Sequence, residues 1–111
     1  MLTEQPILIT SIQCKETGGI IKNRFISFQG TFGAEGTKSL GVVNADTNVG
    51  EMTPVTVKGI AIVQTAYPIT VGQAVQAFDD GTAAPLDAGP IEGYAMDAAS
   101  AAYQFIRILL V

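Results

Sequence analysis

The chain has no histidine and no tryptophan, and Cys14 is its only cysteine. These absences exclude Ser-His-Asp and Cys-His catalysis, the ordinary zinc sites and any disulfide within the chain. The only adjacent carboxylates, Asp79 and Asp80, precede a Gly-Thr pair, which is typical of a tight turn rather than of an acid–base pair. We therefore expect that the protein is not an enzyme and holds no cofactor.

Charge is also scarce, at 14% of residues with a net charge of −4. The basic residues are scattered: Lys15, Lys22, Arg24, Lys38, Lys58 and Arg107. A nucleic-acid-binding protein would cluster them against phosphates, so we expect no nucleic-acid partner. No signal peptide and no membrane-spanning stretch are encoded, which predicts a soluble protein without a membrane partner. With 48% apolar residues, either other subunits cover part of the surface, or the domain is simply rich in alanine and glycine.

Two loops imitate ligand-binding motifs. Residues 30–39 contain glycines followed by a lysine, as phosphate loops do, but Thr37 separates Gly36 from Lys38 and no long helix follows. The motif needs these residues adjacent, so a glycine-rich loop is the better interpretation. Residues 44–51 carry four oxygen-bearing side chains, but the glycine and the glutamate are misplaced for an EF-hand. We interpret this segment as a polar turn and predict no metal site.

Short alternating segments bounded by turn residues dominate the rest of the chain. The predicted strands cover residues 7–15, 24–28, 40–43, 54–64, 74–78, 83–86, 91–96 and 103–111. Residues 79–82 (Asp-Asp-Gly-Thr) predict a hairpin turn, and Gly59, within the longest strand, predicts a bulge or the close approach of another backbone. Residues 97–102 could form one helical turn at most. The pattern predicts a single all-β domain over residues 1–111, a small barrel or sandwich of about eight short strands.

One loose pattern occurs twice in the chain. The matched stretches are residues 19–28 with 68–77, and residues 40–46 with 92–98. The first pair aligns at a shift of 49 positions with one identity, Ile20 with Ile69, and the second pair needs a small insertion. Chance is the alternative explanation. The hypothesis is that two pseudo-repeated strand–turn–strand units build one shared barrel.

The sequence resembles the small capsid decoration (cement) proteins of tailed bacteriophages. The similar segments are residues 24–26, 40–42, 57–63, 69–75, 80–86, 91–100 and 105–111. The resemblance implies a structural virion protein that binds the outer surface of a phage capsid and stabilises it, after assembly in the host cytoplasm. Its implied partners are the major capsid protein and further copies of itself, with a trimer favoured over a dimer. The family offers no catalytic residues to carry over.

A different class remains as an alternative, a fibre-like β-domain that binds a host surface or a carbohydrate. Sugar binding favours exposed aromatic side chains, and Tyr67, Tyr94 and Tyr103 are available. The absence of tryptophan weakens this alternative.

The N-terminus is the first candidate for an interface. Residues 1–8 could form an extended arm that is either disordered or added as a strand to a neighbouring subunit or the capsid. We favour strand addition, because residues 7–9 are apolar on both faces and would otherwise expose a sticky edge. The loop at residues 30–39 is the second candidate. The predicted capsid or subunit interface residues are Leu2, Ile7, Leu8, Ile9, Phe32 and Lys38.

Overall fold

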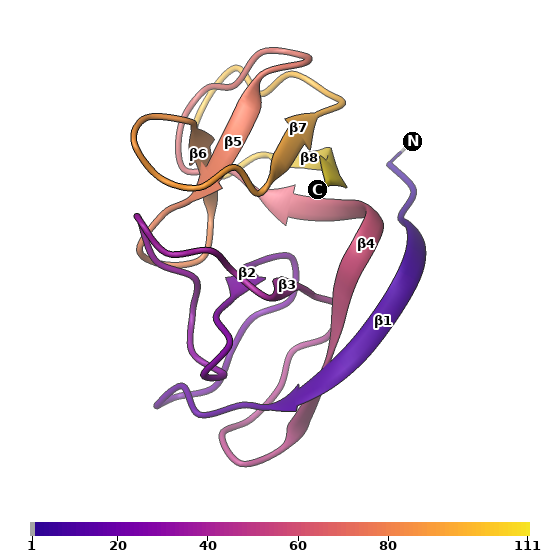
Figure 1. Ribbon diagram of the computed structural model, residues 1–111, viewed down its shortest axis with the longest axis vertical. Coiled ribbons are helices and arrows are strands. Elements are labelled where there is room, and N and C mark those ends of the chain that lie inside the picture. Colours follow the sequence, from indigo (N-terminus) through magenta and orange to yellow (C-terminus); the bar gives the residue numbers. More distant parts are fainter. Residues whose placement is uncertain (1) are drawn as a thin grey trace.

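The computed structural model describes residues 2–111 and contains one antiparallel sheet of eight strands (Figure 1). The strands are β1 (Gln5–Gln13), β2 (Phe25–Ile26), β3 (Gly41–Val43), β4 (Met52–Gln64), β5 (Ala74–Ala77), β6 (Ala83–Pro85), β7 (Gly93–Ala95) and β8 (Phe105–Leu110). Their order is β2-β3-β4-β8-β7-β5-β6, with β1 on β4. A parallel bridge from Thr65 to Ala83 brings the end of β4 to β6 and nearly closes the sheet into a barrel. The predicted all-β fold of about eight strands is confirmed.

Residues 97–102 form bends and turns, so the described part of the chain contains no helix there. None of residues 2–111 belongs to a helix long and apolar enough to cross a membrane. The hairpin predicted at residues 79–82 joins β5 to β6, with Gly81 at a φ of 79° and its N–H donating to Phe78 O. Glycine is favoured there because a side chain would strain the left-handed backbone.

β4 is the longest strand and runs through both halves of the molecule (Figure 1). Gly59, near the middle of the strand, has a φ of 105°. A Cβ at this position would meet Gln5 O, and it would lie 2.7 Å from Ile7 N. Only glycine therefore lets β1 lie against β4 at this point, which confirms the predicted close approach of another backbone.

Two clusters of buried side chains form the core. The larger cluster is formed by Phe25, Val42, Ala61, Val63, Ile69, Val75, Ala77, Ala83, Ala95, Ala99, Ile106 and Ile108. The smaller cluster is formed by Cys14, Ile20, Ile26, Val43 and Val55. Cys14 is fully buried.

The pairing pattern of the sheet occurs twice. In the first half the ladder pairs are Phe25–Val42, Ile26–Gly41, Val42–Thr56 and Val43–Val55, and in the second half they are Ala74–Tyr94, Val75–Gly93, Tyr94–Leu109 and Ala95–Ile108. The isolated bridge of Ile20 with Thr47 likewise matches that of Ile69 with Ala99. The two pseudo-repeated units predicted from sequence are therefore confirmed, since equivalent residues make equivalent backbone contacts.

The duplication extends further than the sequence indicates. β1 lies on the start of β4 as the end of β4 lies on β8, because Thr10 pairs with Val55 and Ala61 pairs with Ile108. We call β1, β2, β3 and residues 52–57 of β4 the first repeat, and residues 58–64 of β4 with β5, β7 and β8 the second repeat. β4 thus ends one repeat and begins the next.

The repeats also explain two unusual backbone conformations. Among the described residues, Asn23 and Tyr103 are the non-glycine residues with positive φ, at 66° and 62°. Gly72 and Gly50 occupy the equivalent positions in the other repeat, at 82° and 89°. Gly50 N donates to Cys14 O as Tyr103 N donates to Thr65 O. The local turn dictates this conformation, and a bulky residue adopts it at a cost of roughly 1 kcal/mol or more.

The predicted N-terminal arm needs a correction. Residues 5–8 are the first part of β1 and pair with β4 of the same chain, so residues 2–4 are the described residues that precede the strand. Met1 lies outside the described residues. The partner residues of β1 lie some forty positions or more further along the chain, and alternation within a segment does not identify its partner.

Candidate interaction surface

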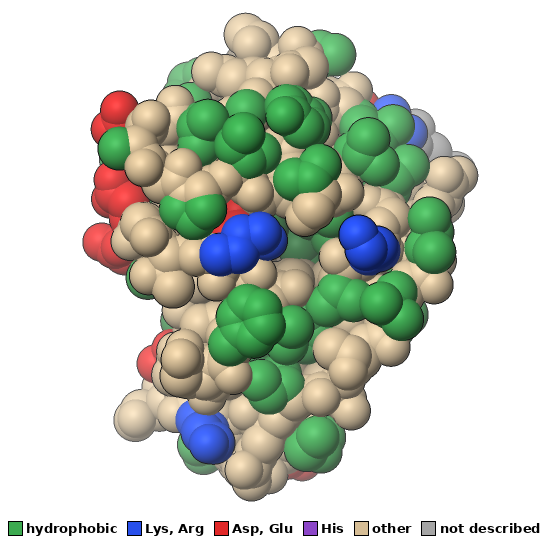
Figure 2. Space-filling view, in the orientation of Figure 1, with side chains coloured by type: hydrophobic (Ala, Val, Ile, Leu, Met, Phe, Trp, Pro, Cys, Tyr) green, Lys and Arg blue, Asp and Glu red, His purple; other side chains and the backbone are tan. Residues whose placement is uncertain are grey.

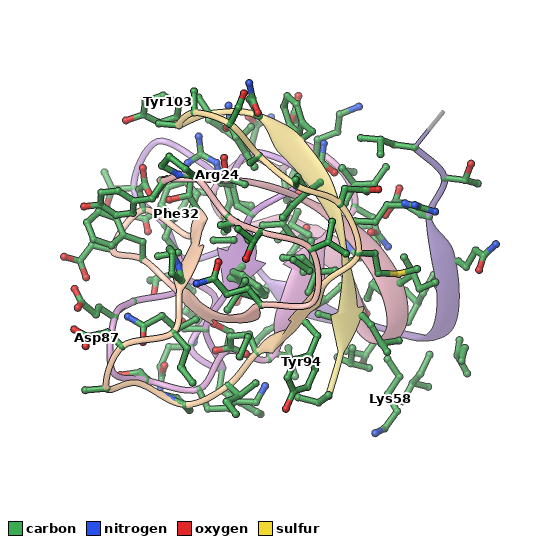
Figure 3. The ribbon with its side chains drawn as sticks, turned by 90° about the horizontal axis from the view of Figure 1, so that it is seen from above. Arg24, Phe32, Lys58, Asp87, Tyr94 and Tyr103 are labelled. Atoms are coloured by element: carbon green, nitrogen blue, oxygen red, sulfur yellow. The ribbon has the colours of Figure 1, made fainter. Side chains whose placement is uncertain are left out.

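Apolar side chains lie on the outer face of the sheet in the second repeat. Tyr94 of β7 pairs with Leu109 of β8, which pairs with the half-buried Ile60 of β4. Tyr94 and Leu109 are 40% and 46% exposed. Figure 2 shows hydrophobic side chains across this side of the molecule, and in Figure 3 Tyr94 and Lys58 point out of it. We call Tyr94 and Leu109 the outer row of the second repeat.

β1 presents the second exposed apolar surface. It lies at the margin of the molecule, paired with β4 along one edge (Figure 1). Ile7, Leu8 and Ile9 are 83%, 51% and 50% exposed, and none of the residues 5–13 carries a charge. Leu2, which precedes the strand, is also exposed. Charged residues usually protect an edge strand, whereas here the protective features of β1 are Pro6 and two register shifts, between Pro6 and Leu8 and between Leu8 and Ile9.

The other two predicted interface residues make contacts within the chain. Phe32 is half-buried and packs against the smaller core cluster, with the Arg24 guanidinium 5.8 Å from its ring centroid. Lys38 Nζ lies 2.8 Å from Glu92 Oε1. The structure therefore brings Ile7, Leu8 and Ile9 together on one strand but does not bring Phe32 or Lys38 to that surface. Whether any of these residues contacts a capsid stays a prediction.

Glu92 is a buried carboxylate that the sequence analysis missed. It precedes β7, and its side chain is 2% exposed. Besides the Lys38 ion pair, Oε2 accepts a 2.7 Å hydrogen bond from Ser39 N. The carboxylate thus fastens the end of the loop at residues 30–39 to the second repeat. The signal available in the sequence was one acidic residue at the start of an otherwise apolar strand.

A second ion pair lies on the outer face of β8. Asp97 Oδ1 lies 2.9 Å from Arg107 Nη2, and Asp97 Oδ2 accepts hydrogen bonds from Arg107 Nε and from the Arg107 backbone N–H. These hydrogen bonds favour the charged carboxylate, so they lower the pKa of Asp97 from 3.8 to about 2. Asp97 thus ties the turn at residues 97–102 to β8.

This pairing makes stability depend on pH. Because the folded state lowers the pKa of Asp97 to about 2, the carboxylate contributes stability that is present above pH 3.8 and is lost as the pH falls through 2. Asp97→Asn should lower the melting temperature at pH 7, and its deficit should shrink as the pH falls from about 4 to about 2. Thermal melts across this range measure the difference. Asp87→Asn, an exposed carboxylate without an ion pair among the described residues, controls for lost charge. A deficit independent of pH would contradict the assignment.

Two further acidic side chains belong to the polar turn at residues 44–51. Asp46 Oδ1 accepts a hydrogen bond from Lys22 N, and Glu51 Oε1 accepts one from Asn48 N, so these groups act within the polar turn predicted at residues 44–51. Within residues 2–111, no three His, Cys, Asp or Glu side chains lie close enough to hold a metal ion. The same part of the chain lines no pocket.

The three tyrosines do not form one platform. Tyr67 is stacked edge-to-face on Phe78, with ring centroids 5.4 Å apart. Tyr94 and Tyr103 point out of opposite sides of the molecule (Figure 3). A sugar site built from all three, as the carbohydrate alternative would favour, is therefore not assembled.

The fold and its surfaces define a small all-β protein with exposed apolar strands suited to protein–protein association. The sequence profile of the phage cement protein family matches residues 5–110. The chain therefore belongs to the phage cement protein family and is a structural virion protein bound to the capsid. The predicted resemblance is thereby confirmed.

Comparison with solved structures agrees in fold. The N base of the head fibre gp8.5 of bacteriophage phi29 superposes with a TM-score of 0.76 at 24% identity, covering 94% of this chain and 95% of that chain. No curated protein matches the sequence.

Proposed function

We propose that the protein binds the outer surface of the phage capsid and stabilises it, with the major capsid protein as its partner. It acts as a homo-oligomer, a trimer rather than a dimer, and joins the head in the host cytoplasm. It performs no catalysis. Family membership and the absence of histidine support this role, and residues on β1 are its proposed capsid contact.

The observation that carries the proposal is the uncharged surface of β1. Ile7 and Ile9 are at least half exposed on a strand whose outer edge has no partner among the described residues. Apolar edges of this kind promote aggregation when they face water. A partner that covers β1 would remove this liability and gain the apolar area it buries.

The test is saturable binding to expanded capsids that lack the protein. Ile9→Lys places a charge on the proposed contact, and because Ile9 is 50% exposed the fold should tolerate it. We expect capsid affinity to fall by at least tenfold, the equivalent of roughly 1.4 kcal/mol. Bound protein is measured by co-sedimentation with the capsids. Val71→Lys is the matched control, since Val71 is 65% exposed and lies outside β1.

Equal binding of the two variants would exclude β1 as the contact. Failure of the natural chain to saturate capsids, together with binding to a glycan, would favour the host-surface alternative.

A further inference from the structure

The two repeats meet through a buried contact. In the first repeat, Val42 and the adjacent Thr56 are both fully buried. Val42 belongs to the larger core cluster, together with Ala61 and Val63 of the second repeat. One face of the first repeat is therefore covered by the second.

The equivalent face of the second repeat is open. The pair Tyr94–Leu109 corresponds to Val42–Thr56, because each pair joins the same two strands of its repeat. Whereas Val42 and Thr56 are fully buried, Tyr94 and Leu109 are 40% and 46% exposed. The outer row of the second repeat therefore offers an apolar surface of the kind that a buried contact needs. Among the described residues, none covers the exposed part of Tyr94 and Leu109.

The first repeat has the complementary vacancy on β1. Ala61 and Val63 pair with Ile108 and Ile106 and are fully buried. Their counterparts are Thr10, which pairs with Val55 and is exposed, and Ile12, which pairs with Thr53 and is half-buried. We call Thr10 and Ile12 the inner row of β1. Ala61 and Val63, which share the larger cluster with Val42, therefore have equivalents that are less completely covered: Thr10 is exposed, and Ile12 is half-buried against the smaller cluster.

We infer that a second copy of this chain fills both vacancies. The outer row of one copy, Tyr94 and Leu109, packs against the inner row of β1, Thr10 and Ile12, in the next copy. This contact continues between chains the one that joins the two repeats within a chain. It rests on the proposed self-association and not on capsid binding.

The inference limits the symmetry of the oligomer. The two surfaces differ, so one contact joins copies head to tail and leads to a closed ring or an open filament, unless a two-fold axis lets one pair of copies make both contacts at once. The proposed trimer corresponds to the closed ring of three copies. The inference also gives the two faces of β1 different roles. Ile9 pairs with Thr56, and its side chain lies on the face opposite to that of Thr10. One face meets the next copy while the other remains available to the capsid.

Disulfide trapping tests the contact directly. Cys14 is first replaced by threonine, which the second repeat carries at the equivalent buried position, Thr65. Two variants are then made in this background, Leu109→Cys and Thr10→Cys, with tags of different size. Under oxidising conditions the mixture should yield a cross-linked species containing one chain of each kind. Each variant alone should yield none.

A second measurement tests whether the contact holds the oligomer together. By sedimentation the natural chain should form a ring of three or more copies, and Tyr94→Asp should reduce it to single chains. Val71→Asp, which charges an equally accessible apolar residue outside both rows, should leave the oligomer intact. Circular dichroism should show the sheet unchanged in both variants.

The outcomes separate this inference from the proposed function. Cross-linking of either variant with itself, an oligomer that survives Tyr94→Asp, or a natural chain that remains single at every concentration would overturn the inference. In each of these cases saturable capsid binding by the natural chain would still support the cement role. A head-to-tail ring that fails to bind capsids would support the inference and overturn the proposed function.

Discussion

Gly93→Ala should lower the free energy of unfolding by about 2–4 kcal/mol, a large effect for one methyl group. The φ of Gly93 is not positive, so backbone strain is not the cause. An added Cβ would meet the carbonyl oxygen of Leu109, and it would lie 2.7 Å from Ile108 Cγ2. The carbonyl belongs to the paired strand β8 and cannot move without opening the ladder between β7 and β8.

Gly41 offers an independent check in the other repeat. It is the equivalent of Gly93, and a Cβ there would meet the carbonyl oxygen of Thr56 and lie 2.9 Å from Val55 Cγ1. Gly41→Ala should therefore cost a similar amount. Gly36→Ala is the control, since Gly36 has a φ of 84° but nothing within 4 Å of an added Cβ, so it should cost only about 1 kcal/mol.

Urea unfolding followed by circular dichroism measures all three variants. If Gly93→Ala or Gly41→Ala cost no more than Gly36→Ala, the close approach of the paired strands would be refuted. If Gly93→Ala and Gly41→Ala cost similar amounts, the two repeats have kept the same close approach of strands although the residues around the two glycines differ.

Local features of the fold could be predicted from the sequence. Alternation and turn residues located every strand to within a few residues. The two faces of a strand lie in different environments, so apolar and polar side chains alternate along it. The Asp79-Asp80-Gly81-Thr82 turn and the close approach at Gly59 were predicted for the same kind of reason. At these points a neighbouring backbone leaves no room for a side chain, so only glycine fits.

Long-range features could not be predicted in this way. The sequence marks Ile7 and Ile9 as apolar, but it does not say that β4 takes one edge of β1 and leaves both side chains exposed. Likewise, the sequence does not show that Lys38 has a partner, because only the fold brings Glu92 next to it. The positive φ of Tyr103 could not be predicted from tyrosine itself. The turn that requires a positive φ is marked by a glycine only at the equivalent position of the other repeat, Gly50. Pairing partners distant in sequence decide each of these cases.

The pair of Lys38 and Glu92 predicts the second large effect. Lys38→Met removes the cation and leaves a carboxylate that is 2% exposed with one remaining hydrogen bond, from Ser39 N. Removing one partner of a fully buried pair costs roughly 3–5 kcal/mol. Because the Lys38 side chain is 45% exposed, water can replace part of its interaction, and we expect a loss of about 2–3 kcal/mol. Lys22→Met, at an exposed lysine without an ion pair among the described residues, should change stability by less than about 0.5 kcal/mol.

The double variant distinguishes an ion pair from simple packing by Lys38. Glu92→Gln keeps the shape of the side chain and can still accept the hydrogen bond from Ser39, but it no longer needs a cation. In that background Lys38→Met should cost less than it does alone, by a coupling energy of about 1–2 kcal/mol. Chemical unfolding of the four chains measures this coupling. Additive losses would mean that Lys38 contributes through its aliphatic stem, so its charge would be free for the capsid contact first predicted for it. A clear coupling means instead that the charge of Lys38 is already used to hold the loop at residues 30–39 on the second repeat.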